Sequence, residues 1–357
     1  MTLRPVRLAA ALALAPTLAR AQSASSCTAP VARTAAQADT LHGTIVRDPY
    51  RWLEDTEAAE THAWVEAENC ATFAWLAAIP ERDQIRQRLT RLWNYQRFGV
   101  PTRQGGRYVW SKNDGLQNQS VYYWQSSLTA APQLLLDPNR LSTDGTVALT
   151  SWDVSEDGRW FAYGTASGGS DWNEFHVRDI TSGRDMADTL RWIKFSGLSW
   201  SHDNAGFFYS RYPAPEGNEL TSVVRNQKLY FHRRDTPQSA DALVYERPDK
   251  PDWGLGGGVS DDGRYLIINV SLGTDVRNRL YYLDLRHVLR PRVVGTVVPL
   301  LDDFDASYGF VGNIGPVFYV VTNLDAPRYR LIAIDTRRPA RANWREVIPQ
   351  AAGVLQG

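Results

Sequence analysis

Five short stretches of this chain repeat one pattern at intervals of roughly fifty residues. In each, a glycine is followed by aromatic and β-branched residues: 106–110, 158–163, 206–210, 263–268 and 315–320. The steps between successive glycines are 52, 48, 57 and 52 residues. A tight turn that leads into an apolar strand, repeated at this period, is typical of radial β-repeats. The repeat therefore predicts an all-β protein whose sheets are arranged around an axis.

Turn residues indicate that each repeat contains a β-hairpin. Asp157-Gly158 and Asp262-Gly263 each separate two apolar runs, and Asp203-Asn204 stands in the same place before Gly206. An Asp-Gly pair between apolar runs is a strong signal for a hairpin turn. Further strand patterns lie at 122–124, 134–136, 175–177, 228–231 and 279–285. Four strands per repeat match one propeller blade. A β-sandwich is the alternative architecture, but it does not predict five evenly spaced copies.

The segment before the repeats has a different pattern. Residues 22–46 are polar and alanine-rich without a period, and we expect an extended arm there. Residues 55–79, with Asp55 or Thr56 as a cap, and residues 81–96 read as two helices. The expected domains are a signal peptide at 1–21, an N-terminal arm and helical leader at 22–98, and a truncated β-propeller at 99–357.

The first 21 residues have the pattern of a signal peptide. Arg4 and Arg7 form a charged start, and the apolar run from Leu8 to Leu18 is too short to span a bilayer as a helix. Ala19-Arg20-Ala21 then supplies small residues at the cleavage positions. A disordered alanine-rich leader is the alternative. The pattern predicts export, to a periplasm or to the medium.

Composition and spacing narrow the classes of partner. The 39 Lys and Arg balance the 39 Asp and Glu, so no global charge favours nucleic acid or an anionic membrane. The six histidines form no His-x-x-x-His pair, and a metal site is not expected. Residues 254–258 are glycine-rich but lack a phosphate-loop Gly-Lys-Ser/Thr, and we expect a blade connection there. We therefore expect no cofactor, no metal, no nucleic acid and no membrane partner.

Cys27 and Cys70 are the two cysteines of the chain. Export would place them in an oxidising compartment, which permits a bridge between them. Because Cys27 lies in the arm, the sequence leaves open whether they form a disulfide or remain two thiols.

Long motifs in this chain resemble those of the prolyl oligopeptidase family of serine peptidases, in the family's order. They are Asp48 to Asp55, Trp64 to Asn69, Trp93 to Tyr95, Asn113 to Ser120, Gly168 to Trp172, and Val259 to Tyr265. The resemblance covers nearly everything from Leu41 onward. It implies a seven-bladed propeller that covers an α/β-hydrolase domain, with the helical leader packed against the hydrolase. It also implies cleavage of short peptides after proline.

The catalytic residues that this resemblance implies are not found in the sequence. A hydrolase nucleophile sits at a Gly-x-Ser-x-Gly elbow, and the near matches at Ser170, Ser199 and Ser260 lack the last glycine. We therefore expect about five of seven blades, in a fragment of a longer peptidase or a truncated gene product. No catalytic residue is assigned, and the chain alone should be inactive. The full-length protein is expected to be a monomer.

Three propeller residues are candidates for substrate binding by resemblance. Asp171 would face the hydrolase domain, where it can pair with an arginine that helps hold the substrate. Phe195 resembles the propeller aromatic that borders the substrate pocket, and an aromatic wall suits the apolar ring of proline. Thr274 falls where the family can place another pocket-lining side chain. From the residues alone, Asp171 would be a turn or cap residue and Phe195 a core residue of a blade.

Three functions remain open at this point. The first is the N-terminal part of an exported prolyl oligopeptidase, whose propeller gates access for short proline-containing peptides. The second is a non-enzymatic periplasmic binding module, which needs no nucleophile but does not explain the motif at 48–55. The third is a propeller glycosidase with two carboxylates across the central channel, although no acid pair stands out for that role.

Overall fold

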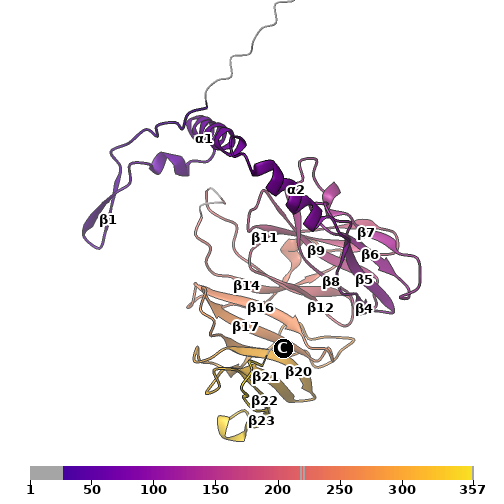
Figure 1. The fold of residues 1–357 in the computed structure, drawn as a ribbon. Helices are drawn as coiled ribbons and strands as arrows, with labels where there is room; N and C mark the ends of the chain where they lie inside the picture. The colour runs from indigo at the N-terminus through magenta and orange to yellow at the C-terminus, as the bar shows by residue number, and fades with distance from the viewer. Residues whose placement is uncertain (1–26, 218, 220–221, 356–357) are drawn as a thin grey trace, which may run out of the picture. The chain divides into compact units, whose positions relative to one another are not determined.

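The computed structural model describes residues 27–217, 219 and 222–355, and the predicted signal peptide at 1–21 lies outside them. The chain falls into two compact units that divide between Leu92 and Trp93 (Figure 1). We call them the N-terminal unit and the propeller unit. In the described part of the chain, neither helix has the length and apolarity needed to cross a bilayer.

The first two strands of the N-terminal unit form a hairpin that the sequence analysis missed. Strands β1 (Ala38–Leu41) and β2 (Thr44–Arg47) pair in antiparallel fashion, so the later part of the expected extended arm forms a hairpin. The turn residues His42 and Gly43 both have positive φ, at 51° and 81°. Two positive φ angles suit the right-handed twist of a two-residue hairpin. His42 is an uncommon residue for this position, which is why the turn was not recognised.

Two helices follow, and both are shorter than predicted. After the 3₁₀ turn η1 (Arg51–Glu54), helix α1 spans Ala59–Ala77 and helix α2 spans Arg82–Trp93. Neither Asp55 nor Thr56 caps α1, because the helix begins after Ala58 without a side-chain cap. The carboxylate of Asp55 instead accepts the backbone N–H of Glu57, at 3.2 Å.

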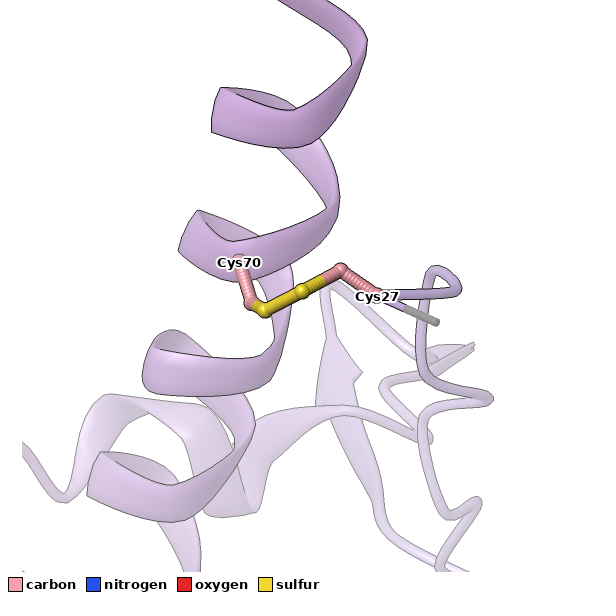
Figure 2. Close-up of a disulfide and its surroundings, with 2 residues drawn as sticks. All are labelled: Cys27 and Cys70. Atoms are coloured by element: carbon pink, nitrogen blue, oxygen red, sulfur yellow. A yellow bond between two sulfur atoms is a disulfide. The ribbon is translucent and has the colours of Figure 1, made fainter. Parts of the chain in front are cut away.

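Cys27 and Cys70 form a disulfide, which resolves the alternative that the sequence left open (Figure 2). Their Cα atoms lie 5.3 Å apart, and the bond joins residues 43 positions apart in the sequence. It ties the arm that precedes β1 to the middle of helix α1. A cross-link of this kind stabilises mainly by restricting the unfolded chain.

Five antiparallel sheets follow one another through the described part of the propeller unit, which confirms the predicted propeller fold. We number them as blades 1 to 5 (Figure 1). Blade 1 contains β3 (Arg97–Phe98), β4 (Thr102–Gln104), β5 (Arg107–Asn113), β6 (Val121–Gln125) and β7 (Gln133–Leu136). Blade 2 contains β8 (Val147–Val154), β9 (Trp160–Ser167), β10 (Asn173–Asp179) and β11 (Arg184–Ile193).

The remaining three blades repeat the four-stranded plan. Blade 3 contains β12 (Leu198–Trp200), β13 (Gly206–Arg211), β14 (Lys228–Arg233) and β15 (Ala242–Tyr245). Blade 4 contains β16 (Trp253–Val259), β17 (Tyr265–Leu272), β18 (Arg279–Asp284) and β19 (Val298–Leu301). Blade 5 contains β20 (Tyr308–Ile314), β21 (Val317–Thr322), β22 (Arg330–Asp335) and β23 (Arg345–Ile348). Three short 3₁₀ turns lie between strands: η2 (Pro138–Arg140), η3 (Gln238–Ala240) and η4 (Arg341–Asn343). The glycine-rich run at 254–258 lies inside β16, so its prediction as a connection is wrong.

A serine and an aspartate shape the hairpin turn in three of the blades. The hydroxyl of Ser155 donates to Asp157 at 2.6 Å, and that of Ser260 donates to Asp262 at 2.7 Å. Ser201 and Asp203 make the same bond in blade 3, at 2.5 Å. Asp157 and Asp262 each precede a glycine of positive φ, at 68° and 69°. These local bonds explain why the hairpin turns could be predicted from the sequence.

Apolar side chains fill the space between successive blades. Four core clusters join blade 1 to 2, 2 to 3, 3 to 4 and 4 to 5 in turn. Between blades 2 and 3, for example, Phe175 and Leu190 pack with Phe207 and Tyr209, and all four are almost fully buried. Burial of such side chains is the main favourable term in folding.

Side-chain amides cover the first strand of several blades, which is the strand at the edge of its sheet. Gln119 accepts the N–H of Leu149 at 3.0 Å and donates to the carbonyl of Val147 at 2.7 Å. Asn278 binds both the N–H and the carbonyl of Tyr308, at 2.6 and 2.9 Å. Each amide comes from the preceding blade. It replaces the backbone partner that an edge strand lacks, and so links neighbouring blades.

Candidate functional site

Strand order places the three candidate residues at one end of the blades. Asp171 lies between β9 and β10, the second and third strands of blade 2, and Thr274 lies in the equivalent loop of blade 4. Phe195 lies in the connection from β11 of blade 2 to β12 of blade 3. In an antiparallel four-stranded blade, these connections leave from the same end, opposite to the first hairpin. We call the two ends the loop face and the hairpin face.

The loop that carries Asp171 is open and polar. Gly168 and Gly169 both have positive φ, and the N–H of Trp172 donates to the hydroxyl of Ser170 at 3.1 Å. The side-chain amide of Asn173 donates to the backbone carbonyl of Asp171 at 2.8 Å. The carboxylate of Asp171 is exposed and forms no ion pair with any other described residue. It is therefore available to a cation from outside the described residues.

Trp172 makes several side-chain contacts with the loops next to it on the loop face. The sequence analysis did not select this residue. Its ring makes edge-on contacts with Trp192 and Tyr212, with centroids 5.8 and 6.3 Å apart. The ammonium of Lys194 lies 4.4 Å from its ring centre, and its indole N–H donates to the carbonyl of Glu219 at 2.9 Å. The sequence did contain a signal for Trp172, because this residue ends the Gly-Gly-Ser-Asp-Trp motif that includes Asp171.

Two cavities flank Trp172. One has a volume of about 360 Å³ and lies against the loop between β13 and β14, with Tyr212, Pro213 and Val224 in its lining. The other has a volume of about 340 Å³ and is lined in part by Thr165 and Trp192. Concave spaces with aromatic walls and a few polar groups are typical of small-ligand and peptide sites.

Phe195 is exposed, in contrast to the alternative that placed it in a blade core. Its side chain is 69 % exposed, whereas Ile193, two residues earlier, is fully buried. Phe195 and Trp192 both have positive φ, at 52° and 63°. A bulky residue rarely adopts this backbone conformation unless the surrounding structure imposes it, and such strain concentrates at functional sites.

Thr274 occupies a separate turn on the loop face. It follows Gly273, whose φ is 54°, and its side chain is exposed. The neighbouring Asp275 is paired with Arg277 at 2.6 Å, and this hydrogen-bonded pair lowers the pKa of the Asp275 carboxyl to about 2. Among the described residues, no hydrogen bond, ion pair or ring contact joins Asp171, Phe195 and Thr274 to one another. The structure thus places the three on one face without bringing them into contact.

A third cavity, of about 370 Å³, lies at the hairpin face. It is lined by the turns and first strands of several blades: Gln104, Asp153, Val154, Glu156, Ser199, Trp200, His202, Val259 and Asp261. Burial raises the pKa of the Asp153 carboxyl to about 6, although its bond from the N–H of Trp200 opposes the shift. In the part of the chain that is described, no group of three or more His, Cys, Asp or Glu side chains could hold a metal ion.

Comparison with known families decides where this chain belongs. The model of the prolyl oligopeptidase N-terminal β-propeller domain matches residues 30–356. The chain belongs to this family.

Individual relatives of this prolyl oligopeptidase propeller are similar over most of the chain. It is 37 % identical over 337 residues to a prolyl endopeptidase of Elizabethkingia meningoseptica, covering 94 % of this chain and 46 % of the relative. It is 33 % identical to prolyl oligopeptidase A of Amanita bisporigera, covering 85 % of this chain and 43 % of the relative. The chain therefore spans about half the length of these curated relatives.

Solved prolyl oligopeptidase structures share the fold. Prolyl oligopeptidase B from Galerina marginata, bound to a 25mer macrocyclization substrate, superimposes with a TM-score of 0.79 at 28 % identity. That match covers 91 % of this chain and 48 % of the solved chain. A prolyl endopeptidase from a study of inter-domain dynamics in catalysis and specificity gives a TM-score of 0.80 at 31 % identity, covering 91 % and 47 % of the two chains.

Proposed function

We propose that this chain is the propeller part of an exported serine endopeptidase that cleaves short peptides after proline. The observation that carries the proposal is the family match over residues 30–356, together with the five blades. The curated relatives are prolyl endopeptidases and prolyl oligopeptidases about twice as long as this chain. By resemblance, the bond cleavage itself would belong to an α/β-hydrolase domain of the complete protein.

In the complete enzyme the chemistry would be acyl transfer. A serine oxygen attacks the carbonyl carbon of the proline residue while a histidine accepts the serine proton, and backbone donors stabilise the oxyanion. The bond from that carbon to the nitrogen of the next residue then breaks, and the histidine gives its proton to the leaving amine. Water hydrolyses the resulting acyl-enzyme and frees the serine. None of these groups is assigned to a residue of this chain. The propeller would limit access to the active site, because a ring of blades admits short peptides and excludes folded proteins. It would also contact the bound substrate.

The loop face is the side that we assign to the substrate. Phe195 supplies an exposed aromatic surface for an apolar ring, and Asp171 supplies a carboxylate that is free to bind an arginine of the hydrolase domain. Thr274 lies on the same face, in blade 4, and would line another part of the pocket. The hydrophobic effect favours burial of the Phe195 ring by a bound peptide.

The helices of the N-terminal unit support a second contact with the hydrolase domain. Ile85, Leu89 and Leu92 of α2 lie four and three residues apart, on one face of the helix, and are 55 %, 49 % and 50 % exposed. Large apolar side chains grouped on a surface are typical of an interface. We therefore assign this surface to the hydrolase domain, as the resemblance implies.

Export is part of the proposal. The Cys27–Cys70 disulfide supports it, because structural disulfides persist in oxidising compartments. The charged and apolar pattern of residues 1–21 supports it independently. Fractionation of the native host, followed by N-terminal sequencing of the mature protein, tests it. Cleavage after Ala21 and recovery outside the cytoplasm are the expected results.

The activity is tested with the product of the complete reading frame. We expect it to hydrolyse a fluorogenic peptide at the bond after proline and to leave the matching alanine peptide largely intact. The 357-residue chain alone should not hydrolyse either peptide. A complete product that binds proline peptides without cleaving them would favour a non-enzymatic binding module.

A further inference from the structure

The segment that carries Phe195 is held at several points. The N–H of Tyr212 donates to the carbonyl of Trp192 at 2.9 Å, and the side-chain amide of Gln227 donates to the carbonyl of Lys194 at 2.9 Å. Between these two bonds, Ile193 is fully buried in the core between blades 2 and 3. The Lys194 bond is the last of these anchors before Phe195. It therefore acts on the residue whose left-handed backbone needs an external constraint.

Gln227 is itself rigidly placed. Its side chain is 3 % exposed, and its carbonyl oxygen accepts the N–H of Leu255, on the first strand of blade 4, at 2.6 Å. The preceding residue, Asn226, has positive φ and donates its N–H to the carbonyl of Pro251 at 2.8 Å. A buried amide whose oxygen and nitrogen are both bonded has a fixed orientation. Gln227 thus ties the Phe195 segment to a neighbouring blade.

Gln119, Gln227 and Asn278 each bind the first strand of the following blade, but Gln227 differs from the other two. Gln119 directs its oxygen and its nitrogen to the first strand of the next blade, and Asn278 binds the N–H and carbonyl of Tyr308. Gln227 directs its oxygen to the first strand of blade 4 but its nitrogen to Lys194, in the connection on the loop face. The bond from the Gln227 nitrogen to the carbonyl of Lys194 therefore does not satisfy a backbone group of the edge strand. It restrains the segment that ends at Phe195.

We propose that Gln227 is a positioning residue for the aromatic wall of the peptide site. Its amide fixes the carbonyl before Phe195, so that the exposed ring is held ready for an apolar residue of the substrate. This inference rests on the proposed function, because it takes Phe195 to contact the substrate. A wall that is fixed before binding loses little conformational freedom when the peptide binds, and this favours affinity.

The variant Gln227→Glu separates the two bonds. Its carboxylate can still accept the N–H of Leu255 but can no longer donate to the carbonyl of Lys194. The matched control is Asn278→Asp, which likewise keeps an acceptor for the N–H of Tyr308 and loses the donor. Gln227→Met, of similar length and without hydrogen bonds, is the second variant in case a buried carboxylate prevents folding.

Two measurements on the product of the complete reading frame test the proposal. The first is hydrogen–deuterium exchange of the Tyr212 amide, whose N–H is donated to Trp192 in the same segment. We expect faster exchange in Gln227→Glu and Gln227→Met than in Asn278→Asp. The second is hydrolysis of a proline peptide, for which we expect KM to rise about fivefold with kcat nearly unchanged, the factor expected for one hydrogen bond. Asn278→Asp should leave KM unchanged.

The outcomes are distinct. Exchange at Tyr212 that is no faster in either Gln227 variant than in Asn278→Asp would overturn the positioning role. Faster exchange with an unchanged KM would support the effect of Gln227 on the segment and overturn the assignment of Phe195 to the substrate. An equal rise of KM in the Gln227 and Asn278 variants would show a general effect of blade linkage, and would also overturn the proposal.

Discussion

The imidazole of His232 in blade 3 binds the carboxylate of Asp188 in blade 2, with Nε2 and Oδ1 2.8 Å apart. The other ring nitrogen binds Asp241 at 2.7 Å, and all three side chains are almost fully buried. Tyr209 donates to the second oxygen of Asp241, and the backbone N–H of Asp235 donates to Asp188. This buried network joins two adjacent blades through charge as well as through apolar contact.

The network predicts a loss of stability in alkali. Burial alone would lower the pKa of His232, but its bonds to Asp188 and Asp241 outweigh burial and raise the pKa to about 9. Because this value lies above the ordinary 6.5, the stabilisation is complete below pH 6.5 and is lost as the pH rises through about 9. We expect the free energy of unfolding to fall by on the order of 3 kcal/mol across that window.

Urea unfolding at a series of pH values measures this loss. His232→Gln should lower the stability at pH 6.5 and flatten the alkaline decrease, because glutamine does not titrate. His176→Gln is the control, since burial lowers the pKa of His176 and its titration lies below this window. An alkaline decrease that persists in His232→Gln would contradict the assignment.

The disulfide predicts a redox-dependent stability of the N-terminal unit. Reduction, or Cys70→Ser, should remove about 4 kcal/mol of stabilisation, the chain-entropy value for a loop of this length. Limited proteolysis is the measurement, with cleavage between residues 28 and 50 expected to accelerate in reducing agent. Cleavage rates that do not depend on the reductant would contradict a stabilising role for the bond.

Two adjacent glycines in the turn between β4 and β5 of blade 1 should respond differently to alanine. Gly105 and Gly106 both have positive φ, but a Cβ on Gly105 would lie 2.0 Å from the carbonyl carbon of Asp157 in blade 2. A Cβ on Gly106 would meet no atom within 4 Å. Both variants incur the backbone cost of about 1–2 kcal/mol, and Gly105→Ala should lose roughly 1–3 kcal/mol more through overpacking. Equal urea midpoints for the two variants would show that the turns of blades 1 and 2 are not in close contact.

The exposed carboxylate of Asp171 predicts a charge effect on the loop face. In the product of the complete reading frame, Asp171→Asn should weaken binding of a proline peptide by about 1.5–3 kcal/mol, the range for a hydrogen bond to a charged group. Asp261→Asn, at an exposed acid of the hairpin face, is the control. Inhibition constants of a non-cleaved proline peptide measure the effect, and equal constants for the two variants would count against the role of Asp171.

The sequence predicted the blades well because their turns are set locally. Asp157-Gly158 and Asp262-Gly263 combine a side-chain bond with a glycine of positive φ, and both signals lie within a few residues. The β1–β2 hairpin was missed because His42 stands where asparagine or aspartate is the usual signal. The fold was therefore predictable wherever turn chemistry followed the common pattern.

The candidate site was less predictable because tertiary contacts determine its geometry. Nothing in the residues Trp192 and Phe195 indicates a left-handed backbone, which is accompanied by bonds from Tyr212 and Gln227 more than fifteen residues away. The family resemblance supplied Phe195, but not Trp172 or Gln227. Both of these became visible through their contacts in the structure.

The central claim is that the loop face of the propeller binds the substrate, and one comparison tests it directly. Phe195 and Ile314 are exposed to similar extents, 69 % and 71 %, but Ile314 lies at the hairpin face. In the product of the complete reading frame, Phe195→Ala should raise KM for a proline peptide about tenfold, the equivalent of a lost aromatic contact, and Ile314→Ala should leave KM unchanged. An unchanged KM in Phe195→Ala, or the same increase in both variants, would contradict the account.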